Sequence, residues 1–453
     1  MPYLGNTPTT QSFISGTDYF NGTGSQTAFT LSRTVASIND IQVTVNNVVQ
    51  QPNDAYTISG TTLTMTSAPS AGTNNVYVRY LSTTTQAITP SQGTVSWSTL
   101  DSNVQGDLGI SFKNRIINSN MAIDQRNAGA SVTLGVGNPT YTLDRWCFQT
   151  SQASKLSVQQ NAGSVTPPVG FSNYLGITSL SAYSVGSGDY YTFQQRIEGF
   201  NTSDLGWGTA NAKTITISFW VRSSLTGTFG GSLTNSAFDR SYPFSYTISA
   251  ANTWEYKTIT IAGDTTGTWI GATNGTGIFL TFGLGVGSTY NGTAGSWQAS
   301  GLLSATGATS VVGTNGATFY ITGVQLEVGT QATTFTTAGG SYGAELALCY
   351  RYFQKNGPAL SGNNPCFGAG TVESSTLADF YVKYATTMRA SPTFAYTNVG
   401  IINGNTPTSI NLFMTSYDSA FLQLATSAGM TVGTGIILFA SSNTDFITLT
   451  AEL

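Results

Sequence analysis

The sequence contains no histidine among its 453 residues, and this absence bears first on catalysis. Histidine supplies most general bases near neutral pH, activates most serine and cysteine nucleophiles, and is the commonest metal ligand. Its absence disfavours nucleophilic triads and most transition-metal sites. We therefore expect a structural protein that is not an enzyme and that holds no metal and no cofactor.

Charge is also scarce. Only 8% of residues are charged, the formal net charge is −4, and the 16 basic residues are scattered singly along the chain. No stretch can neutralise a run of phosphates, and no apolar run approaches the roughly 18 residues of a spanning helix. We expect neither nucleic-acid binding nor membrane insertion.

Cysteine is rare and irregularly placed. Cys147, Cys349 and Cys366 are odd in number and show no Cys-x-x-Cys spacing, which favours reduced, packed thiols over a disulfide framework or a zinc site. Neither a basic segment nor an apolar segment follows Met1, so we expect no cleaved secretion signal and folding in the cytoplasm.

The residues that are present indicate packed β-structure. Hydrophobic residues make up 40% of the chain and aromatic residues 12%, which is enough apolar surface to offset chain entropy. Period-2 alternation recurs throughout, with strands expected at 40–45, 75–80, 214–222, 255–261, 277–284, 317–328, 379–384, 421–424, 436–439 and 446–450. The fold class predicted is mainly β, and Gly323 is expected to form a bulge.

Stretches of turn- and loop-forming residues between these segments divide the chain into five parts. We predict an N-terminal β-sandwich at 1–85, a linker or neck at 86–116, a jelly roll at 117–337, a helical connector at 338–356 and a C-terminal β-domain at 357–453. In the neck, Val104, Leu108, Phe112 and Ile116 fall at helical i+4 steps, so this segment is either a short bundled helix or an irregular connector. In the connector, a helix is expected over 341–355, with Leu346, Tyr350 and Phe353 on one face.

Three motifs have both a chemical and a structural interpretation. The run Gly339-Gly-Ser-Tyr-Gly343 matches a nucleophile elbow, but without histidine Ser341 is better interpreted as a helix N-cap. Stretches 118–124 and 201–204 offer oxygen ligands to Ca²⁺, although ordinary Asx-turns explain them as well. A glycosidase needs only two carboxylates, and the acids considered for such a pair are Asp189, Glu198, Asp239, Glu255, Asp264 and Glu327.

Aromatic side chains suit sugar binding because a ring face stacks on the apolar face of a pyranose. Trp207, Trp269 and Trp297 have the Gly or Thr neighbours of loops, and with Tyr381 and Tyr417 they are our candidate glycan contacts. Plain packing is the alternative for each. Trp146 and Trp220 lie within apolar stretches and are expected in the core.

Several segments carry a resemblance to bacteriophage tail-fibre and related virion proteins. The opening Ile117-Asn-Ser-Asn-Met-Ala-Ile-Asp-Gln-Arg-Asn-Ala-Gly, with Tyr141-Thr-Leu-Asp-Arg-Trp, resembles the start of a domain found in them. Gly323-Val-Gln-Leu-Glu-Val-Gly and Ser341-Tyr-Gly-Ala-Glu-Leu-Ala-Leu-Cys-Tyr-Arg-Tyr-Phe resemble its end. The start of the chain, with Tyr3-Leu-Gly-Asn, is similar to attachment domains of cyanophage fibres. The resemblance implies a jelly roll like those of carbohydrate-binding modules, followed by a variable tip.

The resemblance also implies partners and a place. It implies a homotrimer in the virion tail, assembled in host cytoplasm, with residues 1–85 bound to a tail, baseplate or adaptor protein. Residues 357–453 would face the host and adhere to a surface polysaccharide or lipopolysaccharide. A polysaccharide depolymerase using a carboxylate pair, and a purely architectural head or neck fibre or spacer, are the alternatives.

Overall fold

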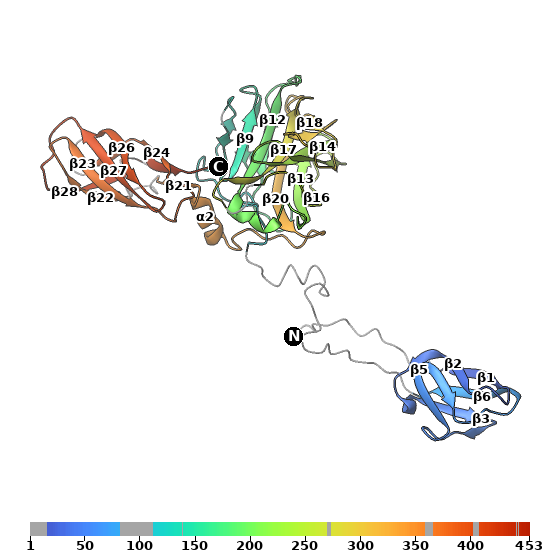
Figure 1. Ribbon diagram of the computed structural model, residues 1–453. Coiled ribbons are helices and arrows are strands. Elements are labelled where there is room, and N and C mark those ends of the chain that lie inside the picture. The colour runs from blue at the N-terminus through green and yellow to red at the C-terminus, as the bar shows by residue number, and fades with distance from the viewer. Residues whose placement is uncertain are drawn as a thin grey trace. The chain divides into compact units, whose positions relative to one another are not determined.

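The computed structural model describes residues 16–81, 112–137, 139–269, 273–357, 366–401, 407–440, 442 and 444–453. The chain divides into two compact units, Met1–Thr99 and Leu100–Leu453. The described residues confirm the mainly β fold class, with several sheets and one α-helix (Figure 1). In this part of the chain, no helix is long and apolar enough to cross a membrane.

The first unit is a small antiparallel sandwich. One sheet has the order β1-β6-β3-β4, and β2 pairs with β5. Alternate residues of these strands form the core, with Val43, Leu63, Val76 and Val78 fully buried. The strands are β1 (Thr17–Gly22), β2 (Ala28–Val35), β3 (Ile41–Val45), β4 (Val48–Val49), β5 (Tyr56–Met65) and β6 (Gly72–Tyr80).

Most of the predicted neck at 86–116 lies outside the described residues. Its last residues contradict a helix, because Phe112 has a left-handed φ of +64° and residues 113–116 are irregular. Ile116 is fully buried in the jelly-roll core, and the Asn114 amide donates to the carbonyl oxygen of Val324 at 3.1 Å. The helix predicted from the i+4 spacing is wrong at this end, because Phe112 and Ile116 pack against residues of the next domain.

The central domain is a β-sandwich with the architecture of a jelly roll (Figure 1). Its two six-stranded sheets have the orders β16-β13-β20-β11-β10-β7 and β15-β14-β17-β12-β9-β8. The strands of the first sheet are β7 (Val132–Thr133), β10 (Leu156–Gln160), β11 (Leu175–Ser179), β13 (Ile215–Ser223), β16 (Glu255–Ile261) and β20 (Thr318–Val328). Those of the second are β8 (Thr140–Tyr141), β9 (Trp146–Thr150), β12 (Tyr190–Glu198), β14 (Gly227–Asn235), β15 (Ser241–Ile248) and β17 (Thr276–Val286). Two short strands, β18 (Asn291–Gly292) and β19 (Ser304–Ala305), lie in a loop.

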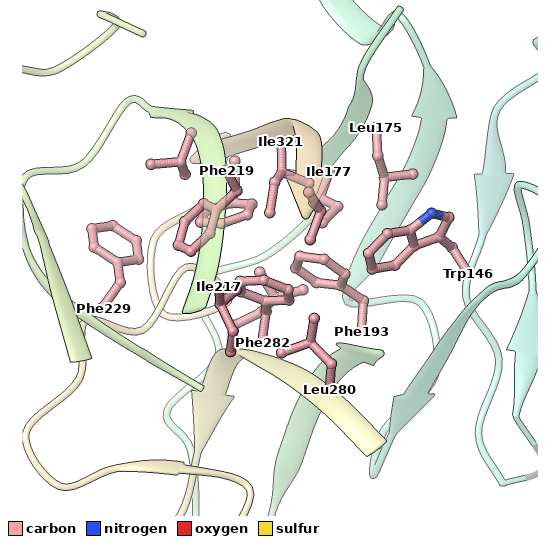
Figure 2. Packing of buried hydrophobic residues seen from close by; sticks show 14 of the residues in the cluster. Trp146, Leu175, Ile177, Phe193, Ile217, Phe219, Phe229, Leu280, Phe282 and Ile321 are labelled. Carbon is pink, nitrogen blue, oxygen red and sulfur yellow. The ribbon is translucent and has the colours of Figure 1, made fainter. Parts of the chain in front are cut away.

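Aromatic rings from both sheets fill the core of the jelly roll (Figure 2). Phe193 and Phe282 stack with their centroids 4.9 Å apart, and Phe219 meets Phe282 edge to face at 5.2 Å. Full burial of such a side chain contributes about 1.5–3 kcal/mol. Trp146 is fully buried as predicted, whereas the core prediction for Trp220 is wrong: it is half-buried and contacts the Tyr256 ring at 5.3 Å.

Gly323 forms the expected bulge in β20. The register between β13 and β20 shifts after Ser218, and Gly323 has a φ of +62°. A Cβ at this position would lie 2.5 Å from the Phe171 ring. Both the backbone conformation and the close ring therefore require glycine here.

The helical connector is shorter than predicted. Helix α2 (Tyr342–Tyr350) begins at the N-cap Ser341, whose hydroxyl accepts from the Ala344 amide, but it ends before Lys355 because β21 (Phe353–Asn356) follows. Glu345 and Cys349 are its buried residues. Phe353, which was expected on the same helical face as Leu346 and Tyr350, lies in β21 instead. Cys147 and Cys349 are packed thiols as expected, whereas Cys366 is exposed.

A second sandwich completes the chain. Its sheets have the orders β21-β29-β24 and β25-β28-β22-β23-β27-β26, around a core that includes Phe380, Leu422, Leu424 and Leu438. The strands are β22 (Cys366–Val372), β23 (Leu377–Lys383), β24 (Thr393–Thr397), β25 (Val399–Ile401), β26 (Pro407–Thr415), β27 (Ser419–Thr426), β28 (Gly435–Ala440) and β29 (Phe446–Thr450).

Buried charge joins this sandwich to the jelly roll. Glu452 accepts from Arg126 at 2.8 Å and also from Arg145, while Arg351 binds Glu198 through two hydrogen bonds of 2.9 and 2.5 Å. We call these five residues the junction cluster. In a chain with so few charges, their concentration at one boundary fixes the two domains to each other.

Candidate functional site

Three tryptophans that are far apart in the sequence converge at one edge of the jelly roll. Trp207 follows the 3₁₀ turn Ser203–Leu205, Trp269 lies in the loop after β16, and Trp297 lies between β18 and β19. Their ring centroids are 4.8, 5.3 and 5.5 Å apart, and each pair is close to perpendicular. Edge-to-face packing of this kind is favourable for aromatic rings. We call the three residues the tryptophan cluster.

The indole N–H groups of the cluster are directed into the protein. Trp207 donates to the carbonyl oxygen of Lys213 at 2.9 Å, Trp269 to that of Thr266 at 3.2 Å, and Trp297 to that of Ala262 at 2.8 Å. Trp207 is 7% exposed, whereas Trp269 and Trp297 are half-buried. The rings therefore expose their carbon faces and edges at the surface, and their N–H donors are already used within the protein.

An ion pair holds the loop that carries Trp269. Arg240 donates two hydrogen bonds of 2.7 Å to the Asp264 carboxylate. Burial raises the pKa of Asp264, but the hydrogen bonds from Arg240 and Thr266 outweigh this effect, and the pKa lies below its usual value. Asn235 adds a hydrogen bond of 2.9 Å to the carbonyl oxygen of Thr268. Hydrogen bonds thus hold the loop at two points before Trp269, at Asp264 and at Thr268.

Glycine permits the close approach of the loops. A Cβ on Gly263 would lie 2.8 Å from the indole nitrogen of Trp207. Gly208 has a φ of +82°, and a Cβ there would lie 2.7 Å from the carbonyl oxygen of Gly267. Larger residues at either position would push the tryptophans apart.

A hollow lies beside the cluster. Trp207 and Trp269 form one wall, Ile278 and Gly277 contribute apolar surface, and Thr202 and Ser203 bring hydroxyl groups; Leu205 and Gly206 complete the lining. Aromatic walls with a few polar groups are the common make-up of small-molecule sites. Such a surface can stack on a sugar ring and bond its hydroxyl groups.

The five predicted contact residues separate into two groups. The three tryptophans meet in the jelly roll, whereas Tyr381 and Tyr417 belong to the C-terminal sandwich, where they are 55% and 56% exposed. Sequence reasoning missed Tyr242, whose ring lies 5.1 Å from that of Trp297, and it missed the role of Arg240. No local motif marks either residue, because their partners lie on other strands and loops.

The other predicted sites are built into the fold. Asn118 is fully buried, and its amide donates to the carbonyl oxygens of Ile123 and Asp144. Asp124 accepts from the backbone N–H groups of Asn127 and Gly129, as in an Asx-turn. Among the described residues, no cluster of three or more His, Cys, Asp or Glu side chains suited to a metal is found.

Each acid considered for a catalytic pair has a partner within the protein. Their partners are Tyr183 for Asp189, Arg351 for Glu198, Asn235 for Asp239, Lys257 for Glu255, Arg240 for Asp264 and Thr333 for Glu327. These contacts explain the positions of the acids without reference to a substrate.

Comparisons with known proteins give structural likeness alone. No protein-family model and no curated protein matches the chain. A crystal structure of the enzymatically active domain of bacteriophage CBA120 tailspike protein 4 is similar over 41% of this chain and 19% of that one, at 11% identity and a TM-score of 0.25. The likeness thus spans about a fifth of the tailspike chain.

Carbohydrate-binding modules are also among the similar structures. A family 11 module of a cellulosomal cellulase of Clostridium thermocellum is similar over 46% of this chain and 99% of its own, at 11% identity and a TM-score of 0.22. A family 4 module is similar over 38% of this chain and 87% of its own, at 15% identity and a TM-score of 0.21. Each of these three structures is similar to this chain over less than half of this chain's length.

The tailspike structure corrects one expectation. We expected a chain without enzymatic activity, yet one of the structures it resembles is described as an enzymatically active domain. The expectation rested on missing histidine, and a pair of carboxylates can hydrolyse a glycosidic bond without one. Composition therefore does not exclude catalysis.

Proposed function

We propose that this chain is a glycan-binding fibre protein of a phage virion and that the tryptophan cluster is its saccharide site. The observation that carries the proposal is the convergence of Trp207, Trp269 and Trp297 from three separate loops, beside a hollow with hydroxyl groups. A packing role alone would be served by burying all three rings. Instead, Trp269 and Trp297 stay half-buried, and the loop that carries Trp269 is held by the Arg240–Asp264 ion pair.

The rest of the proposal concerns assembly. The N-terminal sandwich would bind a tail, baseplate or adaptor protein, and three copies of the chain would form the fibre in the virion tail after folding in the host cytoplasm. The ligand would be a host-surface polysaccharide or lipopolysaccharide. The resemblance at residues 117–129 and 341–353 and the separate compact unit at the N-terminus support this arrangement.

A glycan array probed with the full-length chain tests the binding proposal. We expect selective binding to a small set of surface saccharides and loss of binding to at least one of them in a Trp269→Ala, Trp297→Ala double variant. Binding to no saccharide would contradict the proposal and favour an architectural spacer. Release of reducing ends from a bound polysaccharide would show that the chain also cleaves its ligand.

Cryo-electron microscopy of the virion tests the assembly proposal. Density for a trimer attached to the tail, with its C-terminal domains at a free end, is the expected result. A monomer, or a position at which both ends of the chain are covered by other virion proteins, would contradict it.

A further inference from the structure

A row of apolar side chains crosses the outward face of the six-stranded C-terminal sheet. Strand pairing aligns Ile437 with Ala369, Ala369 with Tyr381, Tyr381 with Phe421 and Phe421 with Met414. Directly opposed residues of antiparallel strands point to the same face. These five residues are the apolar row, and with strands about 4.8 Å apart it extends over about 19 Å.

The apolar row is open to solvent among the described residues. Tyr381 is 55% exposed and Met414 63%, while Phe421 is half-buried and its ring centroid lies 6.3 Å from that of Phe413. The opposite face of the same strands is the domain core, where Phe380, Leu422 and Leu438 are buried. The sheet therefore presents aromatic carbon on both faces, and only the inner one is covered.

A polar row lies beside the apolar one. Thr371 pairs with Asp379, Asp379 with Gln423 and Gln423 with Asn411, so a hydroxyl, a carboxylate and two amides cross the same face in register. Thr371, Asp379 and Gln423 each lie two residues from an apolar-row residue on their own strand. Within the described part of this domain, the Gln423 amide donates two long hydrogen bonds, at 3.3 Å to Glu373 and 3.5 Å to Asp379. These groups retain capacity to bond a ligand.

The charge of the face limits what it can bind. Its one basic strand residue, Lys383, is paired with Asp418 at 2.5 Å, and the remaining charges beside the rows are the acids Asp379 and Glu373. Phosphate, sulfate and acidic sugars would meet carboxylates without a free cation. A neutral polyhydroxylated chain meets aromatic carbon on one side and acceptors and amides on the other.

We propose that this face binds an extended neutral glycan, with Tyr381 and Phe421 stacked on sugar rings and Asp379, Gln423 and Asn411 bonded to hydroxyl groups. It is a second saccharide site on the chain, and it deepens the proposed glycan-binding function by naming the ligand class that a separate domain selects. A chain that runs across the strands would follow both rows at once.

Calorimetric titration of the full-length chain with neutral hexasaccharides of glucose, galactose and mannose, and with sulfated counterparts, tests the proposal. We expect Tyr381→Ala to weaken binding of one neutral hexasaccharide at least about tenfold, and Gln423→Ala to weaken the same one. Tyr19→Ala is the matched control, since Tyr19 is a strand tyrosine of the N-terminal sandwich that is 61% exposed. The affinity of Tyr19→Ala for this hexasaccharide should equal that of the wild type.

The Trp269→Ala, Trp297→Ala double variant separates this inference from the proposed tryptophan site. If the C-terminal face binds as proposed, its hexasaccharide still binds to the double variant, whatever the fate of the tryptophan site. Unchanged affinity in Tyr381→Ala, or preference for the sulfated sugars, would overturn the inference. So would a fall in oligomeric state of Tyr381→Ala by analytical ultracentrifugation without change in sugar binding, because the face would then be an interface between copies.

Discussion

Arg145 and Glu452 form a buried ion pair that ties the loop before β9 to the residues after β29. The Arg145 side chain is 1% exposed, lies 3.6 Å above the Tyr352 ring, and donates to the carbonyl oxygen of Arg196. Burial opposes the charge on Arg145, but Glu452 keeps its pKa above the usual value. The last residues of the C-terminal sandwich are thereby anchored in the jelly roll.

Replacing Arg145 by methionine is expected to lower the free energy of unfolding by about 3–5 kcal/mol, because it leaves Glu452 buried with less compensation. Chemical denaturation of the purified chain measures this. Lys383→Met is the control, since the pair between Lys383 and Asp418 is exposed to solvent, which screens it, and it should contribute little to stability. Equal losses in both variants would show that the junction cluster does not stabilise the domain boundary.

Asp144 should give the stability of the chain a pH dependence. Burial raises its pKa to about 6, against the opposing effects of Arg126 and Gln125. Because the folded state then binds the proton more tightly than the unfolded chain, stability falls as the pH rises from about 4 to about 6, by about 3 kcal/mol in all. Urea denaturation between pH 4 and 7 should show this fall in the wild type and its loss in Asp144→Asn. If the free energy of unfolding of the variant depends on pH as that of the wild type does, the fall cannot be assigned to Asp144.

The contribution of Asp264 to stability should depend on pH in the opposite direction. Its lowered pKa means that the ion pair with Arg240 contributes fully above the usual aspartate pKa of about 3.9 and is lost as the pH falls below it. Asp264→Asn should therefore speed hydrogen exchange of the backbone amides at 262–269 at pH 7, and the wild type should approach that rate only under acid conditions. Asp189→Asn, which alters an acid bonded to Ser151, Tyr183 and Gly186 rather than to this loop, should leave exchange there unchanged. Similar effects of both substitutions would argue against the role of the pair.

Two glycines should respond in opposite directions to alanine. Gly323→Ala should destabilise the chain by about 1–3 kcal/mol, because φ is +62° and Phe171 lies in the way. Gly343→Ala should stabilise it by about 1 kcal/mol, since this glycine lies in α2 with open space around it. Thermal unfolding of the two variants compares them directly, and a stable Gly323→Ala protein would show that the bulge is not constrained.

Residues whose role is local could be predicted from the sequence. The alternation in Ile215–Ser223 and Thr318–Val328 gave the strands, the bulge followed from Gly323, and Ser341 is the cap that its position before an apolar run indicates. Each of these signals lies within about ten residues of the structure that it predicts.

Residues whose partners are distant in the chain could not be placed. The i+4 spacing that ends at Ile116 reflects burial in the jelly roll, not a helix, and Lys355 extends a strand because β29 pairs with it. The tryptophans could be named as aromatic loop residues, but their meeting depends on three loops and on Arg240, which no spacing in the sequence connects.

The most direct test of the account compares Trp269→Ala with Trp254→Ala. Trp254 is also half-buried, and its indole N–H also donates to a backbone carbonyl, that of Thr166 at 2.9 Å, but it lies at the other end of β16. The measurement is the affinity of the full-length chain, by titration calorimetry, for an array-selected glycan whose binding survives Tyr381→Ala. We predict at least about tenfold weaker binding in Trp269→Ala and wild-type affinity in Trp254→Ala. Equal affinity in the two variants would contradict the tryptophan cluster as the saccharide site.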